Sequence, residues 1–215
     1  GTFLLSPSMS MKEIVDTLTT PTGEGVIQIT IPEGYEVRHI VELLKEKGLI
    51  DDEKAFYDVL EKGEFNYDFL QGVDRSYHLE GFLFPDTYEF FSNASPEEIV
   101  TKFLDNFNQR FDEGLRSRAK ELGLDISQAI TLSSIVEREA ADPDERSLIS
   151  GVFHNRLKEG MMLQSCATVQ YILKERKPIL SYEDMAIESD YNTYINEGLP
   201  PAPIANPGLA SIKAA

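Results

Sequence analysis

The chain has 215 residues, of which 41% are hydrophobic and 27% are charged, as is usual for a globular protein with its own core. Its net charge of −17 argues against nucleic acid as a partner, because a phosphate backbone demands a surface rich in Lys and Arg. The single cysteine, Cys166, excludes an internal disulfide, and the three histidines lack the spacing of metal ligands. We therefore expect neither a metal nor a cofactor.

Residues 1–24 are expected to be the tail of a preceding module. Ser10 and Glu13 have the spacing of a capping box, which predicts a helix that begins after Ser10. No signal peptide opens the chain, and no apolar run approaches the ~20 residues that a membrane span needs. Both ends of the sequence are typical of cuts within a larger protein, so we expect any membrane anchor to lie outside it.

Residues 26–75 predict one small α+β module. Residues 26–31 have the alternation of a strand, and residues 36–48 and 52–62 have the apolar spacing of helices, with glycine closing each one. The order strand, helix, helix is typical of a LysM-like module, a small fold often used on glycans. Many small α+β domains share this order, so it does not by itself assign a function.

The aromatic-rich segment at residues 77–90 contains Gly81 and Pro85, which predict a rigid loop or strand edge rather than a helix. Its rings suit either a saccharide platform or ordinary core packing, of which packing is the more common. Residues 96–122 then have the apolar spacing of one helix with a charged, exposed face.

The most informative segment is the helix predicted at residues 130–140. At about 100° per residue, Glu139 lies near the azimuth of Leu132 and Ile135, so a carboxyl group continues the stripe that should face the core. Glu137 is expected to point toward solvent. Burial raises the pKa of a carboxyl group, and a carboxylic acid that keeps its proton near neutral pH can serve as a general acid. The alternative is that the apolar stripe ends here and Glu139 is simply hydrated.

Capping signals place Glu139 near a junction between two helices. Asp125 and Gln128 are spaced to cap the helix that carries it. Asp142, followed by Pro143, predicts the start of the next helix. Catalytic residues often lie at such junctions, where a rigid scaffold meets an open cleft.

The prolines in residues 198–208 exclude a helix or a central strand and predict a stiff extended loop, which by composition could equally be a linker or an SH3-type ligand. Just before it, Asn192 and Thr193 stand between two tyrosines. This mixture of hydrogen-bond donors and acceptors suits sugar hydroxyls and N-acetyl groups.

Several motifs in series resemble the endolytic murein transglycosylase family (MltG, YceG-like). The matching blocks occur in family order: Leu79–Tyr88, Ser134–Glu139, Val152–Leu157, Met162–Ser165, Tyr191–Tyr194 and Gly198–Lys213. Two features depart from the family pattern. Cys166 stands where many relatives carry an acidic residue, and the chain ends just after Lys213, without the C-terminal segment expected of the family.

The resemblance implies an α+β fold, with a LysM-like region at 1–75 and a mostly helical catalytic domain with extended loops at 76–215, truncated at its C-terminus. The implied reaction is cleavage of the β-1,4 bond between N-acetylmuramic acid and N-acetylglucosamine in peptidoglycan. It leaves 1,6-anhydromuramoyl ends, with cleavage expected inside nascent strands. The alternatives are a non-catalytic peptidoglycan-binding scaffold and a muramidase that uses water.

By the same resemblance, the family's catalytic glutamate maps onto Glu139. The candidate substrate contacts are Gln164, Tyr191, Asn192 and Thr193, with Asn155 and Tyr88 as supports. A capping role for Asn155 and a packing role for Tyr88 remain open. The implied partners are peptidoglycan glycan strands and peptidoglycan synthases, met at the extracytoplasmic face of the cell membrane.

Overall fold

The computed structural model describes residues 10–12, 14–15 and 25–215. The tail predicted at 1–24, including Glu13 of its capping box, therefore lies largely outside the described residues. Within the described ranges, no helix has both the length and the apolar composition that crossing a bilayer requires.

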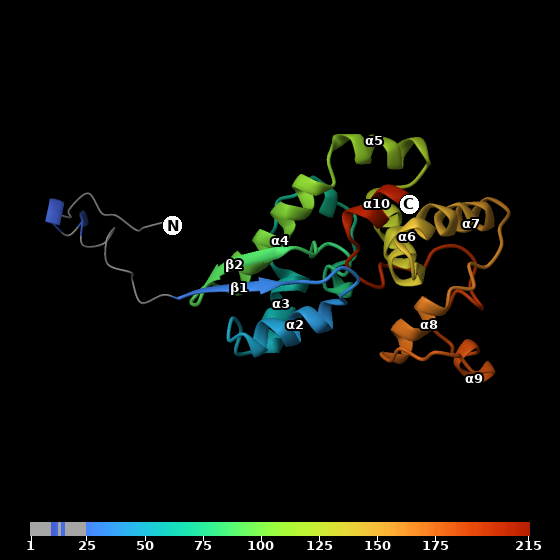
Figure 1. Ribbon diagram of the computed structural model, residues 1–215, viewed down its shortest axis with the longest axis horizontal. Helices are drawn as coiled ribbons and strands as arrows, with labels where there is room; N and C mark the ends of the chain where they lie inside the picture. The colour runs from blue at the N-terminus through green and yellow to red at the C-terminus, as the bar shows by residue number, and fades with distance from the viewer. Residues whose placement is uncertain (1–9, 13, 16–24) are drawn as a thin grey trace.

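Two antiparallel strands, with two helices between them in sequence, form one end of the molecule. Strand β1 (Val26–Thr30) pairs with β2 (Thr87–Phe91), and α2 (Val37–Glu46) and α3 (Glu53–Lys62) connect them. In Figure 1 the strands run between α2 and α3 below and α4 (Pro96–Arg110) above. The first strand and the two helices confirm the elements predicted between residues 26 and 62.

The pairing of β1 with β2 crosses the domain boundary predicted between residues 75 and 76. Ile29 lies opposite Tyr88, and both side chains are buried. They belong to a core that also contains Val41 from α2 and Phe103 from α4. The first strand thus shares its sheet and its core with residues assigned to the following domain.

The single helix predicted at residues 96–122 is wrong, because the structure has two helices there. Helix α4 ends at Arg110, and α5 spans Glu113–Glu121. Phe111 is buried and leaves the helical conformation (φ −87°, ψ 71°). Asp112 then caps α5 by accepting a hydrogen bond from the Leu115 amide at 3.0 Å. An N-cap within an otherwise continuous apolar pattern therefore divides the helix.

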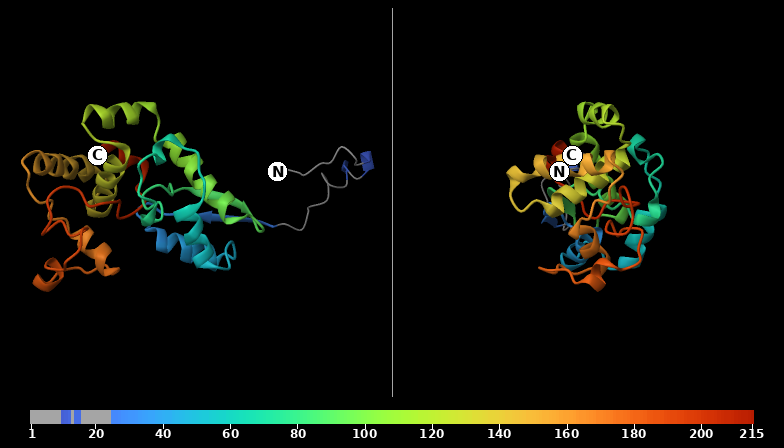
Figure 2. Two further views of the ribbon diagram at one scale, coloured as in Figure 1. Left: turned by 180° about the vertical axis from the view of Figure 1, so that it is seen from behind. Right: turned by 90° about the vertical axis from the view of Figure 1, so that its right-hand side faces the viewer.

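Helix α6 (Ile126–Glu139) is the central element of the other end of the molecule (Figures 1 and 2). The remaining helices are α7 (Arg146–Lys158), α8 (Cys166–Leu173), α9 (Tyr182–Met185) and α10 (Leu209–Ala214). The cap predicted at Asp125 is present as a capping box, and Asp142 also forms one, which caps a 3-10 turn, Pro143–Glu145, that leads into α7. The proline-rich segment at 198–208 contains neither helix nor strand, as predicted.

Helix α6 joins two apolar cores. Ile130 belongs to the core around the strands, whereas Leu132 and Ile135 belong to a second core with Phe153 of α7 and Ala167 of α8. Every residue from Ala129 to Val136 is buried. Helix α6 is therefore enclosed on all sides until its last turn.

Candidate active site

A pocket of about 330 Å³ lies beside the last turn of α6. It is formed by that turn, one face of α7 and the segment that leads into α8. Its lining residues are Glu139, Leu148, Ile149, Val152, Phe153, Arg156, Leu163, Gln164, Ser165 and Cys166. Among the described residues that line this pocket, Glu139 is the only carboxyl group.

The Glu139 carboxylate is held at the N-terminus of α8. The Ser165 hydroxyl donates a hydrogen bond to Oε1 at 2.5 Å, and the Ala167 amide donates to the same oxygen at 3.0 Å. The first amides of a helix have no partner within the helix, so they are available to donate hydrogen bonds to a carboxyl group at this position. Because both of these hydrogen bonds are accepted by the same oxygen, they fix the orientation of the carboxyl group.

The prediction that Glu137 points toward solvent is wrong. Its side chain is only 8% exposed, its Oε2 accepts a hydrogen bond from the Gly208 amide at 3.0 Å, and its Oε1 lies 3.6 Å from the Arg146 guanidinium. The reason is that this face of the last turn of α6 packs against the Gly208 segment and Arg146 instead of meeting solvent. Arg138 likewise donates to the Gly34 carbonyl at 3.0 Å. Glu137 and Arg138 therefore attach the end of α6 to the scaffold, while Glu139 faces the pocket.

Gln164 and Thr193 are brought to the Glu139 pocket in different roles. Gln164 lines the pocket with a left-handed backbone (φ 50°), and its side-chain oxygen accepts from Arg156 at 3.2 Å. Thr193 is buried; its carbonyl accepts from the Gln164 amide at 2.9 Å, and its hydroxyl accepts from the Ser165 amide at 3.0 Å. Thr193 therefore positions the segment that presents Ser165 to Glu139.

Asn192 is fully buried and does not line the Glu139 pocket. Its amide group donates to the carbonyls of Met185 and Ile187 at 3.0 and 2.8 Å, and its side-chain oxygen accepts from the Tyr194 amide at 3.0 Å. These bonds fix the loop that carries Thr193. Tyr191 lines a different cavity, at the C-terminal end of α8.

The two proposed supports are not brought together with Glu139. Tyr88 lies in β2 within the core; its hydroxyl donates to the Phe84 carbonyl at 2.5 Å and accepts from the Asn106 amide at 2.9 Å. This is the packing role that the sequence left open. Asn155 is exposed on α7 and does not line the pocket.

Sequence reasoning missed Ser165 and the apolar rim of the pocket. Ser165 stands directly before α8, at the N-cap position, within a block already singled out as Met162–Ser165. On α7, Leu148 and Val152 are 72% and 46% exposed, one helical turn apart. Two exposed apolar side chains on an otherwise polar helix face are the signal that could have located this rim.

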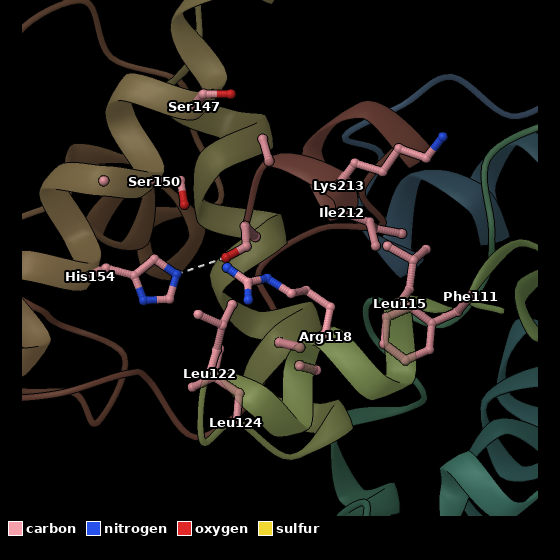
Figure 3. Close-up of a pocket in the computed structure, with 15 residues that line it drawn as sticks. Phe111, Leu115, Arg118, Leu122, Leu124, Ser147, Ser150, His154, Ile212 and Lys213 are labelled. Carbon is pink, nitrogen blue, oxygen red and sulfur yellow. Dashed lines mark hydrogen bonds between the residues drawn. The ribbon is translucent and has the colours of Figure 1, made fainter. Parts of the chain in front are cut away.

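A further cavity of about 260 Å³ lies between α5, α6, α7 and α10 (Figure 3). His154 extends into it and forms a hydrogen bond of 2.7 Å with the Ala215 carbonyl oxygen. None of the described residues that line it is Asp or Glu, so its lining has no side-chain carboxyl group. Elsewhere in the described ranges, no cluster of His, Cys, Asp or Glu side chains has an arrangement suited to a metal ion.

The fold and the pocket define an α+β protein with one oriented carboxyl group at the end of a central helix. The model of the YceG-like family matches residues 1–215, and the chain belongs to this family. A YceG-like protein of Listeria monocytogenes, known from a crystal structure, is 32% identical with a TM-score of 0.79, covering 98% of this chain and 73% of that one.

Curated relatives carry the name endolytic murein transglycosylase. The relative from Bacillus subtilis is 33% identical over 232 residues, which cover all of this chain and 62% of the relative. The relative from Streptococcus pneumoniae (strain D39) is 31% identical, covering 99% of this chain and 43% of its own length. The chain therefore spans about half of the length of these relatives.

Proposed function

We propose that the chain is a lytic transglycosylase that cleaves peptidoglycan glycan strands, with Glu139 as both the acid and the base. The observation that carries this proposal is the single oriented carboxyl group in the lining of the pocket. Glycoside hydrolases normally pair two carboxyl groups across the scissile bond. A lytic enzyme needs only one, because the attacking hydroxyl belongs to the substrate. The name shared by the curated relatives supports the same reaction.

In the proposed reaction, Glu139 donates its proton to the oxygen that links the muramoyl C1 to N-acetylglucosamine, and the C1–O bond breaks. The C6 hydroxyl of the same muramoyl residue then attacks C1 and gives its proton to the Glu139 carboxylate. The products are a strand with a 1,6-anhydromuramoyl end and a strand with a free 4-hydroxyl, and Glu139 regains its proton. Cleavage is proposed within nascent strands.

The hydrogen bonds to Oε1 support this double role. Ser165 and the Ala167 amide fix one carboxyl oxygen, so the same group can meet first the leaving oxygen and then the C6 hydroxyl without losing its orientation. Gln164 is the proposed polar contact for the substrate, since it is exposed in the pocket and held by Arg156. Thr193 acts as a positioning residue through Ser165.

The LysM-like assignment is proposed for residues 26–91 rather than 26–75. The order strand, helix, helix, strand with antiparallel pairing supports this extension, because β2 completes the sheet begun by β1. We further propose that the protein acts at the extracytoplasmic face of the cell membrane, beside peptidoglycan synthases, through an anchor outside residues 1–215. This placement follows from the substrate, which is assembled there.

Two matched variants test the catalytic assignment. Glu139→Gln keeps the shape of the side chain but removes its acid–base function, so release of fragments from purified peptidoglycan should fall by about 100-fold or more. Glu137→Gln is the control: it can still accept the hydrogen bond from the Gly208 amide and should retain most of the activity. Unchanged release by Glu139→Gln would refute the assignment, and the absence of release from the wild-type protein would favour a non-catalytic scaffold.

A further inference from the structure

We propose that a second cavity, at the opposite end of α8 from Glu139, binds an N-acetylhexosamine unit of the same glycan strand. The cavity has a volume of about 590 Å³, which is within the usual range for small-ligand sites. Its lining includes residues of α2, α3 and α8, so both ends of the molecule contribute to it. This inference rests on the proposed function and adds a second point of substrate contact to it.

The chemistry of the cavity wall favours a sugar ring. Tyr57, Tyr77, Tyr171 and Tyr191 all contribute to the lining. The ring of Tyr191 lies between two of the others, with centroids 5.8 Å from Tyr77 and 5.0 Å from Tyr171. Aromatic faces pack against the C–H face of a pyranose, and tyrosine adds a hydroxyl that can bind a sugar hydroxyl or an N-acetyl group.

One polar group in this cavity lacks a partner. The Tyr191 hydroxyl is buried, and among the described residues no hydrogen bond of acceptable geometry reaches it. Burial raises the pKa of Tyr191, and the nearby Tyr171 hydroxyl also influences it, but no well-formed hydrogen bond joins the two hydroxyls. A buried hydroxyl without a partner costs free energy, which a ligand that binds it would recover.

The backbone at the cavity is strained as well. His78, which lines it, and the adjacent Leu79 both have left-handed conformations, with φ of 53° and 58°. Such backbone conformations are unfavourable for residues other than glycine, and they cluster at binding sites. Beside them, the Glu80 carboxyl also lines the cavity; its burial raises its pKa to about 8. Glu80 therefore mostly retains its proton at neutral pH, so the cavity contains a neutral hydrogen-bonding group.

Two elements connect this cavity with the Glu139 pocket. Helix α8 begins at the pocket with Cys166 and reaches the cavity at Tyr171, about 7.5 Å farther along the helix axis. The loop that carries Tyr191 and Thr193 also connects the two sites. Tyr191 lines the cavity, and Thr193 holds the segment that presents Ser165 to Glu139. One strand passing along α8 can therefore contact both sites, whereas a single sugar unit can occupy only one of them.

The test is a binding measurement in the Glu139→Gln background, so that it does not depend on cleavage. Calorimetry with β-1,4-linked N-acetylglucosamine oligomers of increasing length should show tighter binding once the oligomer spans both sites. Tyr191→Phe should weaken binding of the long oligomer by about threefold to tenfold, as expected for one lost hydrogen bond. Tyr182→Phe, at a tyrosine that is 86% exposed on α9, is the matched control.

Tyr77→Ala is the second variant and should weaken long-oligomer binding further, with folding checked by circular dichroism. The proposal would be overturned if Glu139→Gln bound the long oligomer with the same affinity whether or not it also carried Tyr191→Phe. So would binding that requires strands bearing stem peptides, because the cavity would then be a peptide site. Cleavage of peptidoglycan is measured in a separate experiment, with proteins that keep Glu139. The binding result therefore stands even if the catalytic proposal fails.

Discussion

The buried carboxyl group of Glu80 provides a pH-dependent test of the structure. Glu80 is 4% exposed; it accepts hydrogen bonds from the Val37 amide at the start of α2 and from the Asn206 side chain at 3.0 Å. It therefore joins the unit containing α2 to the proline-rich segment. Its burial raises its pKa from 4.5 to about 8, and the charge of the neighbouring Glu36 adds to the effect.

The direction of the effect on stability follows from proton binding. Between pH 4.5 and about 8, the folded protein keeps a proton at Glu80 that the unfolded chain has released. The stabilisation by this group is complete below pH 4.5 and is lost as the pH rises through the folded-state pKa. The free energy of unfolding should decrease by up to about 1.4 kcal/mol per pH unit and by about 5 kcal/mol over the whole interval.

The assay compares the wild-type protein with Glu80→Gln by urea unfolding at several values between pH 5 and pH 8.5. Glutamine has no proton to lose, so its stability relative to the wild type should rise steadily with pH. Groups common to both proteins, including His39, cancel to first order in the difference. A difference that stays constant across the range would mean that Glu80 is ionised in the folded protein, and the reasoning would be wrong.

Two further predictions concern the pocket and the scaffold. Ser165→Ala removes the hydroxyl that donates to Glu139 and should lower kcat for strand cleavage by about 10-fold to 100-fold. Ser147→Ala, an exposed position outside the Glu139 pocket, should have no effect; equal activity of the two variants would exclude the role of Ser165. Gly81→Ala should cost about 3 kcal/mol or more in urea unfolding. Gly81 has φ of +90°, and a Cβ there would lie 2.5 Å from Pro203. Gly48→Ala, at φ of +69° with nothing within 4 Å, should cost only about 1–2 kcal/mol, and similar losses at both glycines would contradict the close contact.

Local signals in the sequence predicted most of the elements. The cap at Asp125 and the glycine at position 48 act over a few residues, so the structure reproduces the helix boundaries that they predict; after Asp142 a 3-10 turn comes first, and α7 begins at Arg146. The division between α4 and α5 was missed because Asp112 resembles any charged residue on a helix face until Phe111 is known to be buried.

Long-range contacts could not be predicted in this way. The pairing of β1 with β2 joins positions about sixty residues apart, and no local pattern specifies it. Helical periodicity selected Glu139 but misplaced Glu137, because it assumes that one face of a helix meets solvent, whereas this face of the last turn of α6 packs against other segments. Asn206, which joins Glu80 to the Tyr35 carbonyl, lay within a segment that composition described only as a stiff loop.

The ends of the reaction products test the central claim most directly. Peptidoglycan digested by the protein in heavy-oxygen water should give muramoyl ends whose mass is one water below that of reducing ends, without incorporated label. This result is expected if the substrate's own C6 hydroxyl is the nucleophile and Glu139 the only acid and base. Labelled reducing ends would contradict the account, since they require attack by water and, with it, a second group to activate that water.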